Sequence, residues 1–150
     1  LHLRTRRQRS DVYKRQVAST PHTQAHDGLA ALASRFVSVD DLPWFATKYD
    51  GIDMKILVED PDTGLVTGLF RFHPGAQLPY HEHVAIEQSW ILEGALHDHE
   101  GVARAGDFVW RPAGNRHAAW SEEGCVALSF FLKPNKFFLE DGEKTGWDRD

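Results

Sequence analysis

The sequence predicts an all-β fold built as a single domain. A chain of 150 residues is long enough for one hydrophobic core, and 41% of its residues are apolar, as in globular proteins. Short apolar runs follow one another closely and are separated by turns that contain Gly or Pro, a spacing typical of a β-barrel or β-sandwich. The chain shows neither an alternation of strands with long helical segments nor an internal repeat.

The first part of the chain supplies the first three expected strands. Phe36–Val39 alternates in polarity and is expected to begin the barrel, after a polar lead-in over residues 17–35. Met54–Val58 and Leu65–Phe72 flank the segment Asp60–Gly64, whose Asp, Pro and Gly residues favour a tight turn. We therefore expect a hairpin between them.

The rest of the chain supplies the remaining strands. Glu87–Leu96 is the longest candidate, with Gly94 as a bend or bulge, and Asp98–Gly101 is expected to form the hairpin turn after it. The barrel should extend over residues 36–138 and be followed by a polar tail, 139–150. Three further apolar runs complete the expected strands: Phe108–Arg111, His117–Ser121 and Val126–Leu132.

The first sixteen residues differ in character from the rest. They hold six basic residues and one acidic residue, which leaves open a nucleic-acid-binding arm, a transit peptide or non-native sequence. Asp11–Gln16 is what the end of a common sequencing-library transposon encodes in one frame, so we hypothesise that residues 1–16 are non-native. Without them the chain keeps 11 of its 17 basic and 21 of its 22 acidic residues, a formal charge of −10 that does not favour nucleic-acid binding.

Four side chains form a candidate metal site. The spacing is Gly75-x5-His81-x-His83-x3-Glu87-x6-Gly94, followed by Gly106-x5-Pro112-x-Gly114-x2-His117. His81, His83 and Glu87 share odd parity, so on one extended strand all three would point to the same face. Two histidines and a carboxylate facing inward need a cation to offset their desolvation. His117 could return on a neighbouring strand and complete the set.

With these two motifs the sequence resembles a cupin, in which both occur in this order and at this spacing. The one departure is Ser121, which replaces the Asn that usually ends the second motif. The resemblance implies a jelly-roll β-barrel that holds one divalent metal ion on His81, His83, Glu87 and His117, and a homo-oligomer, for which Phe137–Leu139 is a plausible contact. Glu87 is the least certain ligand, because three histidines alone suffice in some cupin dioxygenases.

The ligand types leave the metal open. Imidazole suits Fe, Zn, Cu and Ni, whereas a carboxylate favours Fe(II) or Mn(II). Four protein ligands on an octahedral ion leave two positions for substrate and O₂, but on tetrahedral Zn they close the shell, as in a structural or sensory site. We prefer Fe(II), with Zn(II) second.

Several further segments indicate which cupins the sequence resembles most, and they include Glu59–Gly64, Phe108–Gly114 and Phe131–Asn135. They are similar to the small cupins grouped with acetylacetone-cleaving and 2,4′-dihydroxyacetophenone dioxygenases, and to the cupin domain of ChrR-type anti-sigma factors. The first group implies an Fe(II) dioxygenase whose substrates are O₂ and a small β-diketone or hydroxyketone. The second implies a Zn-binding sensor module without turnover, and a cupin isomerase or sugar-binding protein is a third alternative.

Other side chains receive structural interpretations. Cys125, the only cysteine, is expected to be a small buried residue, and one cysteine fits a reducing cytoplasm. Arg71 and Arg111 could hold a substrate anion, but salt bridges are the preferred interpretation. His97 and His99 are expected to lie in a solvated loop, and most aromatic residues are expected in the barrel core. No apolar run is long enough for a membrane span.

Overall fold

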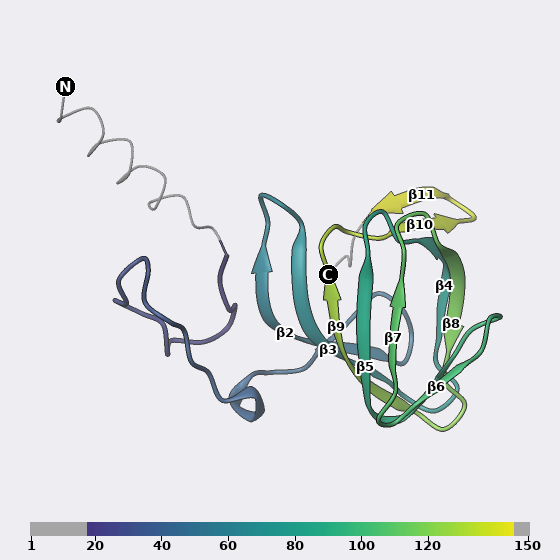
Figure 1. Ribbon diagram of the computed structural model, residues 1–150, viewed down its shortest axis with the longest axis horizontal. Coiled ribbons are helices and arrows are strands. Elements are labelled where there is room, and N and C mark those ends of the chain that lie inside the picture. Colours follow the sequence, from purple (N-terminus) through teal and green to yellow (C-terminus); the bar gives the residue numbers. More distant parts are fainter. Residues whose placement is uncertain (1–17, 146–150) are drawn as a thin grey trace.

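The computed structural model describes residues 18–145, and it confirms the all-β fold (Figure 1). Eleven strands form one antiparallel sheet that folds over on itself, and the short 3₁₀ helix η1 (Val39–Asp41) precedes them. No helix in the described part of the chain is long and apolar enough to cross a membrane. The strands are β1 (Phe45–Ala46), β2 (Ile52–Asp60), β3 (Leu65–Phe72), β4 (Gln77–Glu82), β5 (Glu87–His97), β6 (Val102–Arg104), β7 (Phe108–Arg111), β8 (Arg116–Trp120), β9 (Cys125–Phe131), β10 (Lys136–Leu139) and β11 (Gly142–Thr145).

The long strand β5 belongs to both halves of the folded sheet. Its first part pairs with β9 and β7, in the half that continues through β3 and β2 to β1. Its last three residues pair with β6, and His97 also pairs with β8, in the half that continues through β4 and β10 to β11. The inner faces of the two halves enclose the core and the candidate site.

Most expected strands are confirmed within a residue or two. Leu65–Phe72 is β3 without change, and the turn before it is stabilised by Asp60, whose Oδ1 accepts a hydrogen bond of 2.9 Å from the amide of Asp62. The strand expected at Phe36–Val39 is wrong. Phe36 is 81% exposed and η1 begins at Val39, so this alternating segment lacks a neighbouring strand to pair with.

The lead-in lies beside β2, at the side of the barrel (Figure 1). Its contacts with the barrel include paired backbone hydrogen bonds of 2.9 Å between Ser19 and Glu59, and a bond of 2.6 Å from Thr20 Oγ1 to the carbonyl of Leu57. Residues 1–16, which we expect to be a non-native segment, lie outside the described residues, and so do residues 146–150 of the expected polar tail.

The aromatic residues divide between the two faces of the sheet. Phe70, Phe72 and Phe131 are buried in the core as expected. The same expectation is wrong for Trp90, Phe108, Trp110 and Phe130, which are at least 36% exposed on the outer face of β5, β7 and β9. Alternation along a strand sends neighbouring side chains to opposite faces, and residue type alone does not identify the inner one.

The C-terminal hairpin of β10 and β11 closes one side of the barrel next to β4 (Figure 1). Phe137 on β10 is fully buried, and its ring centroid lies 5.1 Å from that of His81 and 4.8 Å from that of Tyr49. Phe137 therefore packs across the barrel and is not free to form a contact between subunits.

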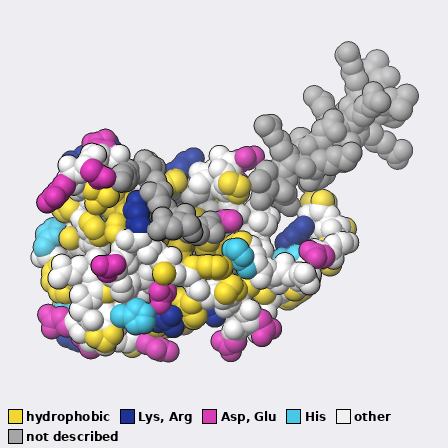
Figure 2. Space-filling view, turned by 180° about the vertical axis from the view of Figure 1, so that it is seen from behind, with side chains coloured by type: hydrophobic (Ala, Val, Ile, Leu, Met, Phe, Trp, Pro, Cys, Tyr) yellow, Lys and Arg dark blue, Asp and Glu magenta, His cyan; other side chains and the backbone are white. Residues whose placement is uncertain are grey.

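The surface carries no concentrated positive charge on the face shown in Figure 2, where Lys and Arg side chains are scattered singly among acidic and apolar ones. Several of the basic residues are neutralised by near neighbours. Arg71 bonds Asp53 at 2.6 Å, which confirms the salt bridge expected for it, and Arg116 bonds Glu82 at 2.6 Å.

Candidate metal centre

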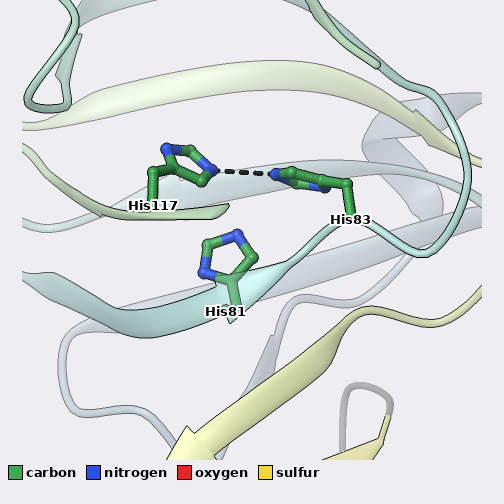
Figure 3. A group of neighbouring side chains, drawn as sticks. All are labelled: His81, His83 and His117. Atoms are coloured by element: carbon green, nitrogen blue, oxygen red, sulfur yellow. Dashed lines mark hydrogen bonds between the residues drawn. The ribbon is translucent and has the colours of Figure 1, made fainter. Parts of the chain in front are cut away.

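Three histidines converge inside the barrel (Figure 3). His81 lies on β4, His83 follows that strand directly, and His117 lies on β8. Each is at most 2% exposed, and their ligand nitrogens all lie within 4.8 Å of one another. Among the described residues they are the only group of His, Cys, Asp and Glu side chains that meets this condition.

The structure corrects the reason why these residues face inward. They do not share one strand, because β4 ends at Glu82 and β5 begins at Glu87. The register of β4 against β8 also shifts between Leu78 and His81, so two inward residues are three positions apart. Pairing of β4 with β8 aligns His81 with His117, and this cross-strand pair brings the two imidazoles together.

Two of the histidines have their Nδ1 atoms occupied by acceptors. Nδ1 of His81 lies 2.8 Å from the carbonyl oxygen of Pro79, so this nitrogen carries the proton and donates it. Nδ1 of His83 donates to Oδ1 of Asn135 over 3.1 Å. Since a neutral imidazole carries a single proton, the Nε2 atom of each ring is left with a free lone pair directed into the barrel.

His117 has a carboxylate near its Nδ1 atom, although the two make no hydrogen bond in the structure. Its Nδ1 lies 3.3 Å from Oδ2 of Asp98, and that oxygen also accepts a hydrogen bond of 2.7 Å from the guanidinium of Arg111. Burial opposes the ionisation of Asp98, but the bond from Arg111 holds the pKa of this carboxyl below its ordinary value. A carboxylate behind Nδ1 favours the tautomer that leaves Nε2 free.

Atoms of the kind that bind metal ions therefore meet at one point. Nε2 of His83 lies 2.8 Å from Nε2 of His117 and 2.8 Å from Oε2 of Glu87. Oε2 of Glu87 is buried and receives no hydrogen bond, although its neighbour Oε1 accepts one from Ser89. Ligand atoms bound about 2.1 Å from one ion at right angles are about 3 Å apart, so this arrangement fits a divalent cation.

Glu87 occupies an intermediate position. Its Oε2 touches His83, but the carboxylate is not part of the group of three histidines whose ligand atoms lie within 4.8 Å of one another. On its other side, Arg111 places a guanidinium nitrogen 3.7 Å from the same oxygen. Burial alone would raise the pKa of Glu87, but the positive charge of Arg111 and the hydrogen bond from Ser89 act in the opposite direction and favour the ionised carboxylate.

His81 and His117 are held neutral. Burial lowers the pKa of His81 to about 4, and burial together with the positive charge of Arg111 lowers that of His117 to about 3. Both imidazoles are unprotonated at neutral pH, which is the state in which they bind a metal ion.

These pKa values predict acid sensitivity of the metal-free protein. An unfolded chain takes up protons on both histidines below about pH 6.5, whereas the folded chain does so only near pH 4 and pH 3. The free energy of unfolding should therefore fall by about 2 kcal/mol for each histidine between pH 7.5 and pH 5. Urea unfolding at the two pH values measures this loss, and His117→Gln should remove about half of it. An equal loss in that variant would contradict the assignment.

The residues around the histidines form a small cavity with two different ends. Its volume is ≈ 30 Å³, measured as the space open to the centre of a water molecule, which is room for about two waters. One end is polar and carries the histidines with Glu87, Ser89, Arg111, Ser129 and Asn135. The other end is apolar and is formed by Phe70, Phe72, Leu78, Leu96, Ala119, Ala127 and Phe131.

Some functional residues have no signal in the sequence. From the sequence, Asp98 is expected only as the first residue of a turn, and Asn135 only as a polar residue after the last expected strand, yet they contact His117 and His83 respectively. Arg111 does form the expected salt bridge, but buried at the site. Cys125 is buried as expected, and burial raises the pKa of its thiol to about 12, so it is not a nucleophile.

Comparison with known proteins identifies the family. Residues 33–134, more than half of the chain, match the family described as the ChrR cupin-like domain. The chain belongs to the ChrR cupin-like family. The fold and the three converging histidines make it a metal-binding cupin, and the expected jelly-roll architecture is confirmed. No curated protein matches the chain significantly.

Several solved structures have similar folds. An RmlC-like cupin from Ralstonia eutropha has a TM-score of 0.67 at 20% identity, covering 75% of this chain and 80% of the other. An acetylacetone dioxygenase from Acinetobacter johnsonii has a TM-score of 0.64 at 20% identity, covering 79% and 88%. The complex of SigE with the anti-sigma factor ChrR from Rhodobacter sphaeroides gives 0.53 at 23% identity, covering 63% and 50%. At these identities the likeness extends to the fold alone.

Proposed function

We propose that this cupin is a mononuclear Fe(II) dioxygenase that cleaves a carbon–carbon bond of a small β-diketone or hydroxyketone. The observation that supports it best is the convergence of imidazole lone pairs beside an apolar cavity end. Neutral imidazoles with a buried carboxylate nearby suit ferrous iron. In this reaction both atoms of O₂ are incorporated, and the cleaved bond leaves two carbonyl products.

Some residues of the site would bind the metal ion, and others would orient those ligands. His81, His83 and His117 would hold the ion, and Glu87 would be either a fourth ligand or a charge beside it. When bound, a ferrous ion would supply Lewis acidity toward the enolate of the substrate and electrons for the reaction with O₂. Asp98, Asn135 and the carbonyl of Pro79 keep the imidazoles oriented.

The apolar end would hold the hydrocarbon part of the substrate and keep bulk water away. Phe70 and Phe131 contact each other edge to face, with ring centroids 5.3 Å apart, and both are at most 5% exposed. A site of low polarity strengthens the attraction between an enolate and a cation, because water does not screen it.

The second candidate is a zinc-binding regulatory module without turnover, as the ChrR relationship suggests. The contact of 2.8 Å between Glu87 and His83 favours it, because three histidines and a carboxylate would close a tetrahedral zinc shell. The two candidates differ in the metal and in reactivity toward O₂.

The deciding experiment is elemental analysis of protein purified anaerobically from cells supplied with both iron and zinc, followed by oxygen-uptake measurements. Iron near one ion per chain, with oxygen uptake on addition of acetylacetone or a hydroxyacetophenone, is the result expected for the dioxygenase. Zinc near one ion per chain that excess Fe(II) does not displace would favour the regulatory module.

The role of Glu87 can be tested separately. Glu87→Ala is expected to weaken metal binding less than alanine at any of the three histidines, by about tenfold, because the carboxylate lies outside their group. Competition with a chelator of known affinity measures the change, and Glu93→Ala, an exposed position on the same strand, is the control. Complete loss of metal would show that the carboxylate is an essential ligand.

A further inference from the structure

The cavity beside the histidines is too small for the proposed substrate as it stands. At ≈ 30 Å³ it admits about two water molecules, whereas a β-diketone is several times larger than one. A substrate must therefore reach the site through a part of the wall that can open.

A much larger cleft lies directly behind one part of that wall. Its volume is ≈ 550 Å³, and it shares two lining residues, Leu96 and Arg111, with the histidine cavity. Its remaining walls come from the turn after β5, from β6 and from β7, and they include the exposed side chains Val102, Phe108 and Trp110. Apolar side chains with a few charged groups are the usual lining of small-molecule sites.

The cleft exists because of the course of β5. β7 pairs with residues 87–90 of this strand and β6 with residues 95–97, in the other half of the sheet. β6 and β7 follow each other along one edge of β5, and the segment between them stays bonded to it, with the amides of Ala105 and Gly106 donating to the carbonyls of Gly94 and Ile91 over 2.9 Å. Beyond this corner the two strands belong to different halves of the folded sheet and do not pair in the described chain, and the cleft lies between them.

A single ion pair spans this opening. Arg111, at the end of β7, donates to Asp98, which follows β5, over 2.7 Å. Their side chains are 6% and 9% exposed, so the pair separates the outer cleft from the cavity. Nε of Arg111 is buried and has no hydrogen-bond acceptor among the described residues. A guanidinium with an unused donor is prepared to bind another anionic oxygen.

Three other approaches to the histidines can be compared with this cleft. A hollow of ≈ 460 Å³ shares Leu78 and Ala119 with the histidine cavity, but these residues face each other on the paired strands β4 and β8, so no gap between strands leads inward there. Phe137, which is fully buried, covers His81 from the C-terminal hairpin. A hollow of ≈ 240 Å³ between the β2–β3 hairpin and Pro134 shares Phe131 with the histidine cavity and is the competing route, but it carries no group that would guide an anion past that ring.

We propose that the cleft between β6 and β7 is the entrance to the metal site, and that the Arg111–Asp98 pair is its latch. An enolate anion of a β-diketone binds the guanidinium in place of Asp98, and the pair separates as the ligand passes inward. The proposal rests on the metal centre of the proposed function but not on its oxygen chemistry, so it is tested without turnover.

The test measures how fast acetylacetonate reaches cobalt(II) bound in the full chain, from the change in visible absorbance after rapid mixing. Val102→Trp fills the outer cleft and is expected to slow binding at least about fivefold. Leu132→Trp is the matched control, since Leu132 is 44% exposed and Val102 45%, but Leu132 does not line the cleft. Cobalt content is measured for each variant, and rates are compared per bound cobalt.

Val66→Trp tests the competing route, because Val66 lines the hollow beside Phe131. The proposal expects its binding rate to match that of the unchanged protein. If Val66→Trp slows binding and Val102→Trp does not, the entrance lies at Phe131 and the proposal is overturned. Equal rates in all three variants would overturn it as well.

Asp98→Asn tests the latch. Because the substitution weakens the Arg111–Asp98 pair, neutral imidazole should bind the cobalt at least about fivefold faster than in the unchanged protein. The binding rate of acetylacetonate should rise by a smaller factor, because this anion already separates the pair in the unchanged protein. The control is Glu100→Gln, which makes the same chemical change in the same cleft but at a residue that bonds Asn115. Unchanged rates for both probes in Asp98→Asn, or an equal acceleration in Glu100→Gln, would overturn the latch.

Discussion

Replacing His83 with alanine is expected to lower the metal affinity of this cupin at least about 100-fold. His83 is the histidine whose Nε2 lies 2.8 Å both from Nε2 of His117 and from Oε2 of Glu87, so it occupies the centre of the site. Its replacement would remove one of the three proposed ligands and leave Oδ1 of Asn135 without the hydrogen bond from this ring. Metal content after dialysis against a weak chelator should fall from about one ion per chain to below about a tenth.

His99→Ala is the control for this experiment. His99 belongs to the His-x-His pair formed with His97, but it is exposed in the turn after β5 and is not part of the group of converging histidines. Its replacement should leave the metal content unchanged. If His83→Ala retained its metal, or if His99→Ala lost it to the same extent, the ligand assignment would be wrong.

The sequence predicts the parts of this fold that depend on local chemistry. The hairpin at Asp60–Gly64 is marked by an Asp that caps its own turn, by Pro61 and by a Gly at φ 80°. β3 alternates over part of its length, and its buried residues Phe70 and Phe72 are apolar enough to be recognised. β5 is recognised from its length and its apolar residues, although its first buried residues, Glu87 and Ser89, are polar. The two histidine motifs indicate the site because their spacing carries over from a family, even though the argument that places them on one strand is wrong.

The sequence does not predict β4, although this strand carries His81. Its residues, Gln77–Glu82, are mostly polar and include Pro79, so they lack the apolar alternation of a strand. The site itself is the reason, because an imidazole occupies the inward position where an aliphatic residue would otherwise mark the core. Apolar alternation does not predict a strand whose inward side chains are polar because they belong to a functional site.

Contacts between segments that are distant along the chain also cannot be predicted from the sequence. Asp98 and His117 meet only because β5 and β8 pair at His97 and Trp120, and this is one of the few contacts between those strands. Parity along β5 predicts that Ser89, Ile91 and Glu93 face inward. It is right for the first two and wrong for Glu93, because the register shifts between Ile91 and Glu93.

The second large effect is expected at the bend that follows this shift. Gly94 has φ 67°, and a Cβ atom placed there would overlap the carbonyl oxygen of Gly124 and lie 2.8 Å from its carbonyl carbon. Both obstacles are backbone atoms, so no side chain can rotate to make room. Gly94→Ala is therefore expected to lower the free energy of unfolding by about 3 kcal/mol or more, as measured by urea denaturation.

This glycine connects the fold to the site. The bend at Gly94 lies where β5 passes from β9 to β8 on one edge and from β7 to β6 on the other, and the cleft between β6 and β7 depends on this bend. Gly101→Ala is the control, because Gly101 lies in the next turn without a positive φ and with no atom within 4 Å of an added Cβ. It should change stability by less than about 1 kcal/mol. Equal effects at the two positions would mean that β5 can shift away from Gly124, and that the bend is not what holds the two halves of the sheet in place.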